Sequence, residues 1–94
     1  IYTKNELDFC KNKPHRLAAR FAVKEAVMKT LGTGTKGVGW KDIETIRKPG
    51  QRPLVKLHNR ALSKSKKLGI KNISISISHS KEYAIAFCVA DKTI

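Results

Sequence analysis

The last third of the chain carries two runs in which large apolar side chains alternate strictly with small ones. Ile73, Ile75 and Ile77 alternate with serine, and residues 83–90 alternate aromatic or branched side chains with alanine and cysteine. A period of two is that of a β-strand, and the four-residue linker 79–82 suits an antiparallel hairpin. The small faces predict that a helix, another subunit or a flat ligand approaches this hairpin closely.

A long helix is predicted from His15 to Leu31, because no glycine or proline interrupts this segment. Pro14 suits the first turn, and Gly32 suits the C-terminal stop. At about 100° per residue an apolar stripe forms, made of Leu17, Phe21, Val27, Met28 and Leu31. The other face carries small and charged side chains: Ala18, Ala22, Glu25, Ala26 and Lys29.

The remaining segments complete an α+β pattern. A short helix or turn is expected in Ile1–Cys10, where Thr3 and Glu6 have capping-box spacing. Strands are expected within Trp40–Arg47 and at Leu54–Leu57, and a second full helix at His58–Leu68. The order helix, helix, strand, strand, helix, strand, strand predicts a mainly antiparallel sheet packed against the long helix.

The balance of charge restricts the kind of partner. Twenty Lys and Arg against seven Asp and Glu give a formal net charge of +13 over 94 residues. One domain, residues 1–94, is expected at this length. The charge implies an anionic partner: nucleic acid, a phosphate-rich ligand, an acidic protein or an anionic membrane. No apolar run approaches the roughly 20 residues of a membrane span, and two cysteines make neither a disulfide scaffold nor a zinc site, so a cytoplasmic protein is expected.

Three charged residues of the long helix could carry chemistry. Lys24 falls inside the apolar stripe, where it either snorkels at the edge of a packed face or is aimed at a bound anion. Glu25 and Lys29 lie one turn apart in the order that favours a solvated surface pair. Their small neighbours and the local excess of cations also suit a magnesium ion that carries phosphate oxygens.

Two loop motifs leave alternatives open. Gly32-Thr33-Gly34 either caps the helix or offers backbone N–H groups to a ligand, but it is not a P-loop. Ser78-His79-Ser80 lies at the hairpin turn, without the elbow or the orienting acid of a serine hydrolase. His79 either caps the turn or hydrogen-bonds a phosphate or ribose.

Several separated blocks resemble one family. The segment Leu17–Gly34, LAARFAVKEAVMKTLGTG, closely resembles the long-helix signature of the small bacterial holo-acyl-carrier-protein synthases, members of the 4'-phosphopantetheinyl transferase superfamily. The blocks that match in the expected order around it are Ile1–Leu7, Trp40–Glu44, Gly50–Leu54, Ser76–Ser80 and Tyr83–Ala86. The resemblance therefore covers nearly the whole chain.

The resemblance implies a reaction and a set of partners. The 4'-phosphopantetheine arm of coenzyme A would pass to a serine of apo-acyl carrier protein, for fatty acid biosynthesis, leaving adenosine 3',5'-bisphosphate. The nucleophile would belong to the carrier protein, which explains why no catalytic serine is needed here. A homotrimer with active sites between subunits would follow, with no nucleic acid and no membrane as partner.

The resemblance also implies roles for individual residues. Glu25 would coordinate Mg²⁺, or Mn²⁺, and Lys29 and Lys24 would offset the charge of the diphosphate. Coenzyme A would contact the remaining candidates: Arg20, Gly32, Thr33, Gly34, His79 and Ser80.

The family also opens with a strand bearing a second, aspartate metal ligand and a helix that docks the carrier protein, and this sequence begins after both. We expect that they precede Ile1 in the natural protein. An inactive subunit of the same shape is one alternative. A non-enzymatic basic module that binds RNA or DNA is the other, since phosphate contacts alone would account for the charge.

Overall fold

The computed structural model describes residues 1–11, 13–33, 37–80 and 83–92. The elements in chain order are α1 (Lys4–Cys10), α2 (Pro14–Leu31), the 3-10 turn η1 (Trp40–Asp42), β1 (Ile43–Ile46), β2 (Leu54–Leu57), α4 (Asn59–Lys67), β3 (Ile70–His79) and β4 (Ala84–Lys92). Both the predicted α+β class and the predicted order of elements are confirmed. The strand expected to start at Trp40 is shorter, because η1 takes its first three residues.

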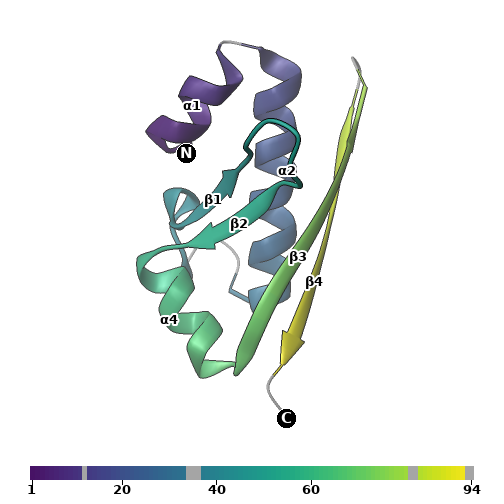
Figure 1. The fold of residues 1–94 in the computed structure, drawn as a ribbon. Helices are drawn as coiled ribbons and strands as arrows, with labels where there is room; N and C mark the ends of the chain where they lie inside the picture. Colours follow the sequence, from purple (N-terminus) through teal and green to yellow (C-terminus); the bar gives the residue numbers. More distant parts are fainter. Residues whose placement is uncertain (12, 34–36, 81–82, 93–94) are drawn as a thin grey trace.

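Helix α2 runs through the middle of the molecule (Figure 1). Helix α1, the antiparallel pair β1–β2 and helix α4 lie on one side of it, and the long β3–β4 hairpin lies on the other. The two strand pairs form separate ladders rather than one continuous sheet. Proline in its first turn and Gly32 at the C-cap, with φ of 74°, bound α2 as the sequence predicts.

The buried face of α2 is rotated around the helix axis relative to the predicted stripe, by less than the angle between consecutive residues. Val27, Met28 and Leu31 are buried as expected, but Leu17 and Phe21 lie half-buried at its edge. The additional buried residues are Ala19, Arg20, Val23 and Lys24. The core that they join also holds Val38, Ile43 and Ala61. Two cations therefore lie on the most buried side of the longest helix, which needs a specific explanation.

The hairpin presents its two faces in an unexpected way. Its register places Ile75 opposite Cys88 and Ser76 opposite Phe87. The isoleucines of β3 and the small residues of β4 therefore share the face that packs against α2. The large side chains of β4 and of Tyr83, which precedes it, point outward beside the serines: Tyr83, Ile85, Phe87 and Val89 are 57%, 48%, 70% and 61% exposed. The sequence predicted that a helix, another subunit or a flat ligand covers the small side chains. Helix α2 covers the face that holds the alanines of β4.

Cys10 and Cys88 are both free thiols. Among the described residues, no helix combines the length and the apolar character needed to cross a membrane.

Candidate active site

Glu25 and Lys29 lie together on the solvent-exposed face of α2, with exposed Ala18 beside them. Within the described part of the chain, no ion pair joins the two charges, so the predicted surface pair is not formed. Ala22 and Ala26 flank them and are only half-buried. A carboxylate and an ammonium group are thus presented side by side next to small residues, where a ligand can come close.

The donor set at this face fits magnesium better than a metal held in a protein cage. Across the described residues, no cluster of three or more His, Cys, Asp or Glu side chains could hold an ion. Mg²⁺ commonly binds through one or two carboxylates, with water and substrate phosphate as its other ligands. The exposed carboxylate of Glu25 meets that requirement.

Lys24 lies elsewhere. Its side chain is fully buried, and its ammonium nitrogen is 2.8 Å from Glu6 Oε1. It also donates to the carbonyl oxygen of Trp40 at 2.9 Å and to that of Ile43. An ammonium group has three donors, and all three are engaged inside the protein. The sequence predicted that Lys24 either snorkels at the edge of a packed face or contacts a bound anion. Neither prediction describes this arrangement, because the ammonium group reaches neither solvent nor an open anion site. Its predicted contact with the diphosphate is not favoured by this geometry.

The sequence predicted a capping role for Glu6 but gave no sign of its contact with Lys24. The capping box is present, since Glu6 N–H donates to Thr3 Oγ1 at 3.2 Å and Thr3 N–H donates to Glu6 Oε1 at 3.0 Å. The same carboxylate also accepts from the N–H of Thr45 at 3.0 Å and binds Lys24. Glu6 and Lys24 therefore join α1, α2, η1 and β1 at one buried point, which fixes how α2 sits in the fold.

Glu44 of β1 lies next to this point. Thr3 Oγ1 donates to its Oε2 at 2.5 Å, and His58 Nε2 lies 3.1 Å from its Oε1. Burial alone would raise the pKa of Glu44, but the hydrogen bonds of Thr3 and His58 outweigh burial and bring this pKa below its ordinary value. The ionised carboxylate is thus a structural tie between the N-terminus, β1 and the start of α4.

Arg20 has no such tie. It is 4% exposed, and its Nε and Nη2 atoms have no hydrogen-bond partner among the described residues. Its guanidinium carbon stacks 4.7 Å from the ring centroid of Phe9. Burial, and to a lesser degree the nearby cation Arg47, lower the pKa of Arg20, opposed mainly by Cys10. Two buried guanidinium donors without a partner are costly, and a bound anion or an ordered water molecule would satisfy them.

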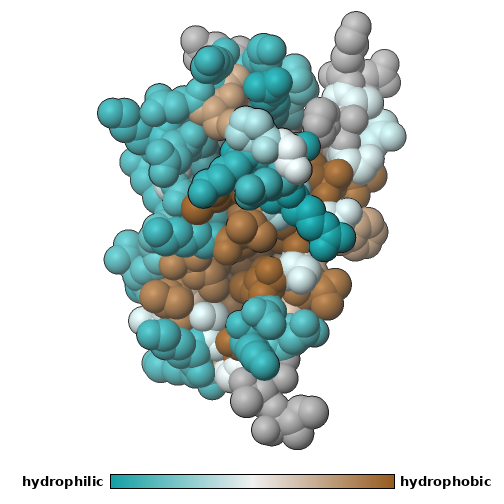
Figure 2. Space-filling view, viewed as in Figure 1, coloured by the Kyte–Doolittle hydropathy of each residue, from teal (hydrophilic) through white to brown (hydrophobic). Residues whose placement is uncertain are grey.

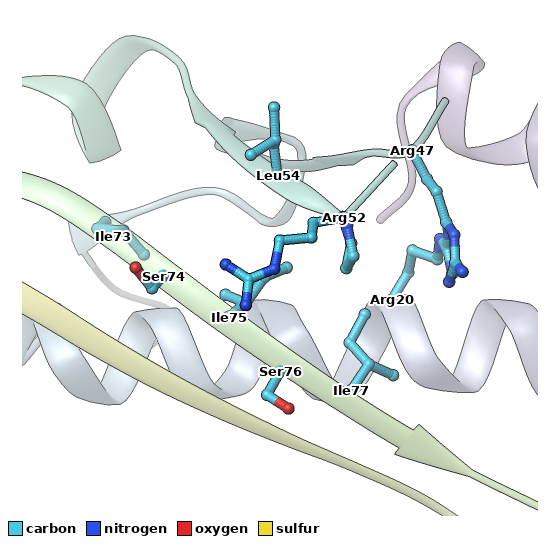
Figure 3. A pocket seen from close by; sticks show the side chains of 10 residues that line it. Arg20, Arg47, Arg52, Leu54, Ile73, Ser74, Ile75, Ser76 and Ile77 are labelled. Atoms are coloured by element: carbon cyan, nitrogen blue, oxygen red, sulfur yellow. The ribbon is translucent and has the colours of Figure 1, made fainter. Parts of the chain in front are cut away.

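Arg20 borders a cavity of about 420 Å³. Arg47, Arg52, Pro53 and Leu54 line it from the β1–β2 side, and Ile73–Ile77 of β3 form its other wall. Figure 3 shows the side chains of Arg47 and Arg20 extending toward the same place at one end of the group of lining residues, with Arg52 nearer its middle. We call this cavity the arginine pocket, because Arg20, Arg47 and Arg52 line it. The sequence singled out Arg20 alone, whereas Arg47 and Arg52 entered only the count of basic residues.

The loop candidates have mixed outcomes. Gly32 caps α2, and the N–H of Thr33 donates to the carbonyl of Met28 at 3.3 Å, so both complete the helix end. Gly34 and the side chain of His79 lie outside the described residues. Ser80 accepts from the N–H of Tyr83 at 3.3 Å and helps to close the hairpin turn. Their predicted contacts with coenzyme A stay predictions.

Two chemical surfaces therefore exist on α2, and they face different ways. Arg20 and Glu25 are five residues apart, which is about 140° around a helix and about 7.5 Å along it. One surface presents a carboxylate and a lysine to solvent, and the other presents three arginines to a partly open cavity. Together they suit an extended, polyphosphorylated substrate rather than a single small ion.

The family model of the 4'-phosphopantetheinyl transferase superfamily matches residues 1–88. This chain belongs to that superfamily.

Its similar relatives share a more particular name. A holo-[acyl-carrier-protein] synthase of Dehalococcoides mccartyi is 50% identical over 90 residues, which are 96% of this chain and 75% of the relative. The synthase of Chlamydia felis is 51% identical over 94 residues, covering 96% of this chain and 74% of the relative. Among solved structures, the Helicobacter pylori holo-[acyl-carrier-protein] synthase in complex with coenzyme A superimposes with a TM-score of 0.82 at 34% identity, covering 95% of this chain and 76% of that one. The Neisseria meningitidis enzyme gives 0.82 at 37% identity, with 98% and 77% covered.

Proposed function

We propose that this chain is a holo-[acyl-carrier-protein] synthase. It transfers 4'-phosphopantetheine from coenzyme A to a serine of an apo-acyl carrier protein and supplies the holo form to fatty acid biosynthesis. Membership of the transferase superfamily and relatives of this name support the proposal. The observation in the structure that carries it is the exposed Glu25 beside Lys29, which forms no ion pair with any residue that the structure describes. Nothing in the comparisons favours the RNA- or DNA-binding alternative. Two free cysteines suit the cytoplasm, which is part of the same proposal.

The reaction asks this chain to position groups and to offset charge. The serine oxygen of the carrier protein bonds to the phosphorus that bears the pantetheine arm, the bond from that phosphorus to the bridging oxygen breaks, and adenosine 3',5'-bisphosphate leaves. Glu25 would hold the metal ion, which supplies positive charge to the diphosphate as it reacts. Lys29 adds a second positive charge one turn away. In this proposal Glu25 also receives the serine proton through a water molecule.

We further propose that the working form is a homotrimer with active sites between subunits. Phe87 and its neighbours on β4 expose a contiguous apolar face that a single chain leaves open to water. Figure 2 shows a second apolar area around the hollow between β2, α4 and β3. The separation of Arg20 from Glu25 around α2 also supports sites shared by two chains, because one coenzyme A could then meet Arg20 of one copy and Glu25 of the next.

A mass-shift assay on apo-acyl carrier protein tests the function. The full-length protein should add the pantetheine arm with Mg²⁺ or Mn²⁺ and lose this activity in a chelator. Glu25→Gln should lose most turnover and keep its far-ultraviolet circular dichroism and its unfolding midpoint, because the side chain is exposed. Asp8→Asn, an exposed acid of α1, is the matched control and should keep its activity.

Two results would reject parts of this proposal. No transfer to any acyl carrier protein, together with tight RNA binding, would replace the enzyme by the nucleic-acid module. Normal turnover of Glu25→Gln with an unchanged metal requirement would remove Glu25 from the site.

A further inference from the structure

A groove lies where β2, α4 and β3 meet, in the apolar area that Figure 2 shows. Its volume is about 520 Å³, and none of the described residues that line it belongs to α2. Its apolar lining residues are Val55, Leu57, Leu62, Ile70 and Ile73. Leu62 is 40% exposed, and the other four are only half-buried. One chain alone therefore leaves a concave apolar surface in contact with water, which favours a partner that covers it.

The walls of this groove are strand edges. Residues 55–57 of β2 and 70–73 of β3 line it. Successive side chains of a strand point to opposite faces, so a strand that presents consecutive residues to one cavity presents its edge. Among the described strands, β2 pairs only with β1 and β3 only with β4, which leaves each with an edge that has no ladder. The ladder of β3 is irregular between Ile70 and Asn72, and such irregularity disfavours pairing, so β2 has the more regular free edge.

The charges around this groove have one sign. We call it the lysine groove, because Lys56 of β2, Lys66 of α4 and Lys71 of β3 line it and no acid does. All three lysines are exposed, and within the described chain none of them forms an ion pair. Glu44 stands opposite Lys56 in the β1–β2 ladder, but its carboxylate is hydrogen-bonded elsewhere. The lysine groove therefore combines an apolar floor with uncompensated positive charge at its rim.

Charge and shape together restrict the occupant of the lysine groove. Lysines at a strand edge repel another basic strand, and a second copy of this chain carries the same net charge of +13. A nucleic acid would match the charge, but its phosphate backbone has no side chains for the apolar floor. An anionic membrane would also match the charge, but its surface does not enter a groove between two strands. An acidic protein segment satisfies both requirements, because an added strand turns alternate side chains to the floor and to the rim.

We propose that the lysine groove binds an extended acidic segment of a partner protein, which adds as a strand to the free edge of β2. Apolar side chains of the segment lie against Leu62 and the floor, and its carboxylates lie near the three lysines. Backbone hydrogen bonds to β2 supply affinity, and the alternation of side chains supplies specificity. The interaction is separate from the transfer of pantetheine, because neither Glu25 nor Arg20 lines the lysine groove.

Binding of a synthetic peptide to the full-length protein tests the inference. The probe is a peptide of about ten residues, the length of a long strand, in which glutamate and valine alternate. Lys56→Glu, Lys71→Glu and Leu62→Asp should each weaken its binding at least about tenfold, because each places a carboxylate beside the bound acidic chain. Lys48→Glu is the matched control, because it makes the same change of charge at an exposed lysine that does not line the groove.

Two further measurements separate strand addition from simple attraction between charges. A peptide in which proline replaces every valine keeps the charge but lacks half of the backbone N–H donors, so it should bind at least about tenfold more weakly. Amide hydrogen exchange within residues 54–57 should slow when the glutamate–valine peptide is bound, because N–H groups at the free edge of β2 then donate to it. Exchange within β4, which does not line the groove, should stay unchanged.

Four results would overturn the inference. The first is no binding of the glutamate–valine peptide up to about 1 mM. The second is an equal loss in Lys48→Glu or equal binding of the proline peptide, since net charge alone would then explain the attraction. The third is tighter binding of single-stranded RNA or of anionic lipid vesicles through the same lysines. The fourth is a shift of Leu62→Asp toward the monomer in sedimentation velocity, which would make the groove an interface between copies. None of these measurements uses pantetheine transfer, so their outcome does not depend on the proposed function.

Discussion

The buried ion pair gives a prediction that separates a structural lysine from a catalytic one. Lys24→Met keeps the length of the side chain and removes its charge. The Glu6 carboxylate, fully buried beside it, then loses its cation, and the carbonyls of Trp40 and Ile43 lose a donor. Breaking a buried pair from one side costs about 3–5 kcal/mol. A chain of 94 residues typically has about 5–14 kcal/mol in total, so Lys24→Met should remove a large part of the free energy of unfolding.

Urea unfolding followed by circular dichroism, at one fixed protein concentration, measures this loss. In thermal unfolding the same change should lower Tm by more than about 12 °C, given about 4–8 °C for each kcal/mol in a domain of this size. Lys29→Met is the control, because an exposed lysine one turn and a residue further on should change stability by no more than about 0.5 kcal/mol. The double variant Glu6→Gln/Lys24→Met should recover stability relative to Lys24→Met, since no unpaired buried charge is left.

The activity of the same variant decides between the two roles. At a temperature where Lys24→Met is still folded, its KM for coenzyme A should equal that of the wild type. A variant that unfolds like the wild type, within about 1 kcal/mol, but binds coenzyme A poorly would refute the reasoning. Lys24 would then be the anion contact that the family resemblance implies.

The remaining predictions concern Glu44 and the outer face of β4. The folded-state pKa of Glu44 lies below 4.5, its ordinary value, so its ionised form stabilises the fold above about pH 4.5, and this stabilisation is lost as the pH falls through the folded pKa. Glu44→Gln should therefore be less stable than the wild type at neutral pH, with a difference in urea unfolding that shrinks as the pH falls below 4.5. A difference independent of pH would contradict the assignment. Phe87→Ser should shift the protein toward the monomer in sedimentation velocity and leave the isolated fold intact, because the ring is 70% exposed in one chain. Ser74→Ala, on the same face, is its control, and an unchanged oligomer in Phe87→Ser would exclude this face as the interface.

Local sequence patterns predicted most of the fold. The period of α2, its proline and its capping glycine are properties of neighbouring residues, and the alternation in the hairpin is also local. Periodicity says which residues share a face, but it does not say which face is buried. The chain places Cys88 and the alanines of β4 against α2 and leaves Phe87 outside, which is the reverse of what hydrophobicity alone would favour.

The candidate site was only partly predictable for a related reason. Glu25 and Lys29 are one turn apart, so their common face could be derived from spacing alone. Glu6 and Lys24 are 18 positions apart and meet only because α1 folds back onto α2. Arg47 and Arg52 likewise reach Arg20 only through the packing of β1 and β2 beside β3. Such contacts between distant segments have no signal in a single sequence.

The small side chains between α2 and the hairpin have a consequence for engineering. Ala86 and Cys88 of β4 are half-buried against the helix, and their strand is hydrogen-bonded to β3, which forms one wall of the arginine pocket. A larger residue at Ala86 would push β4 from α2 and carry β3 with it. The width of the pocket therefore depends on Ala86 and Cys88, which do not line it. Variant libraries that aim to change which ligand this pocket accepts should therefore vary Ala86 and Cys88 together with the arginines.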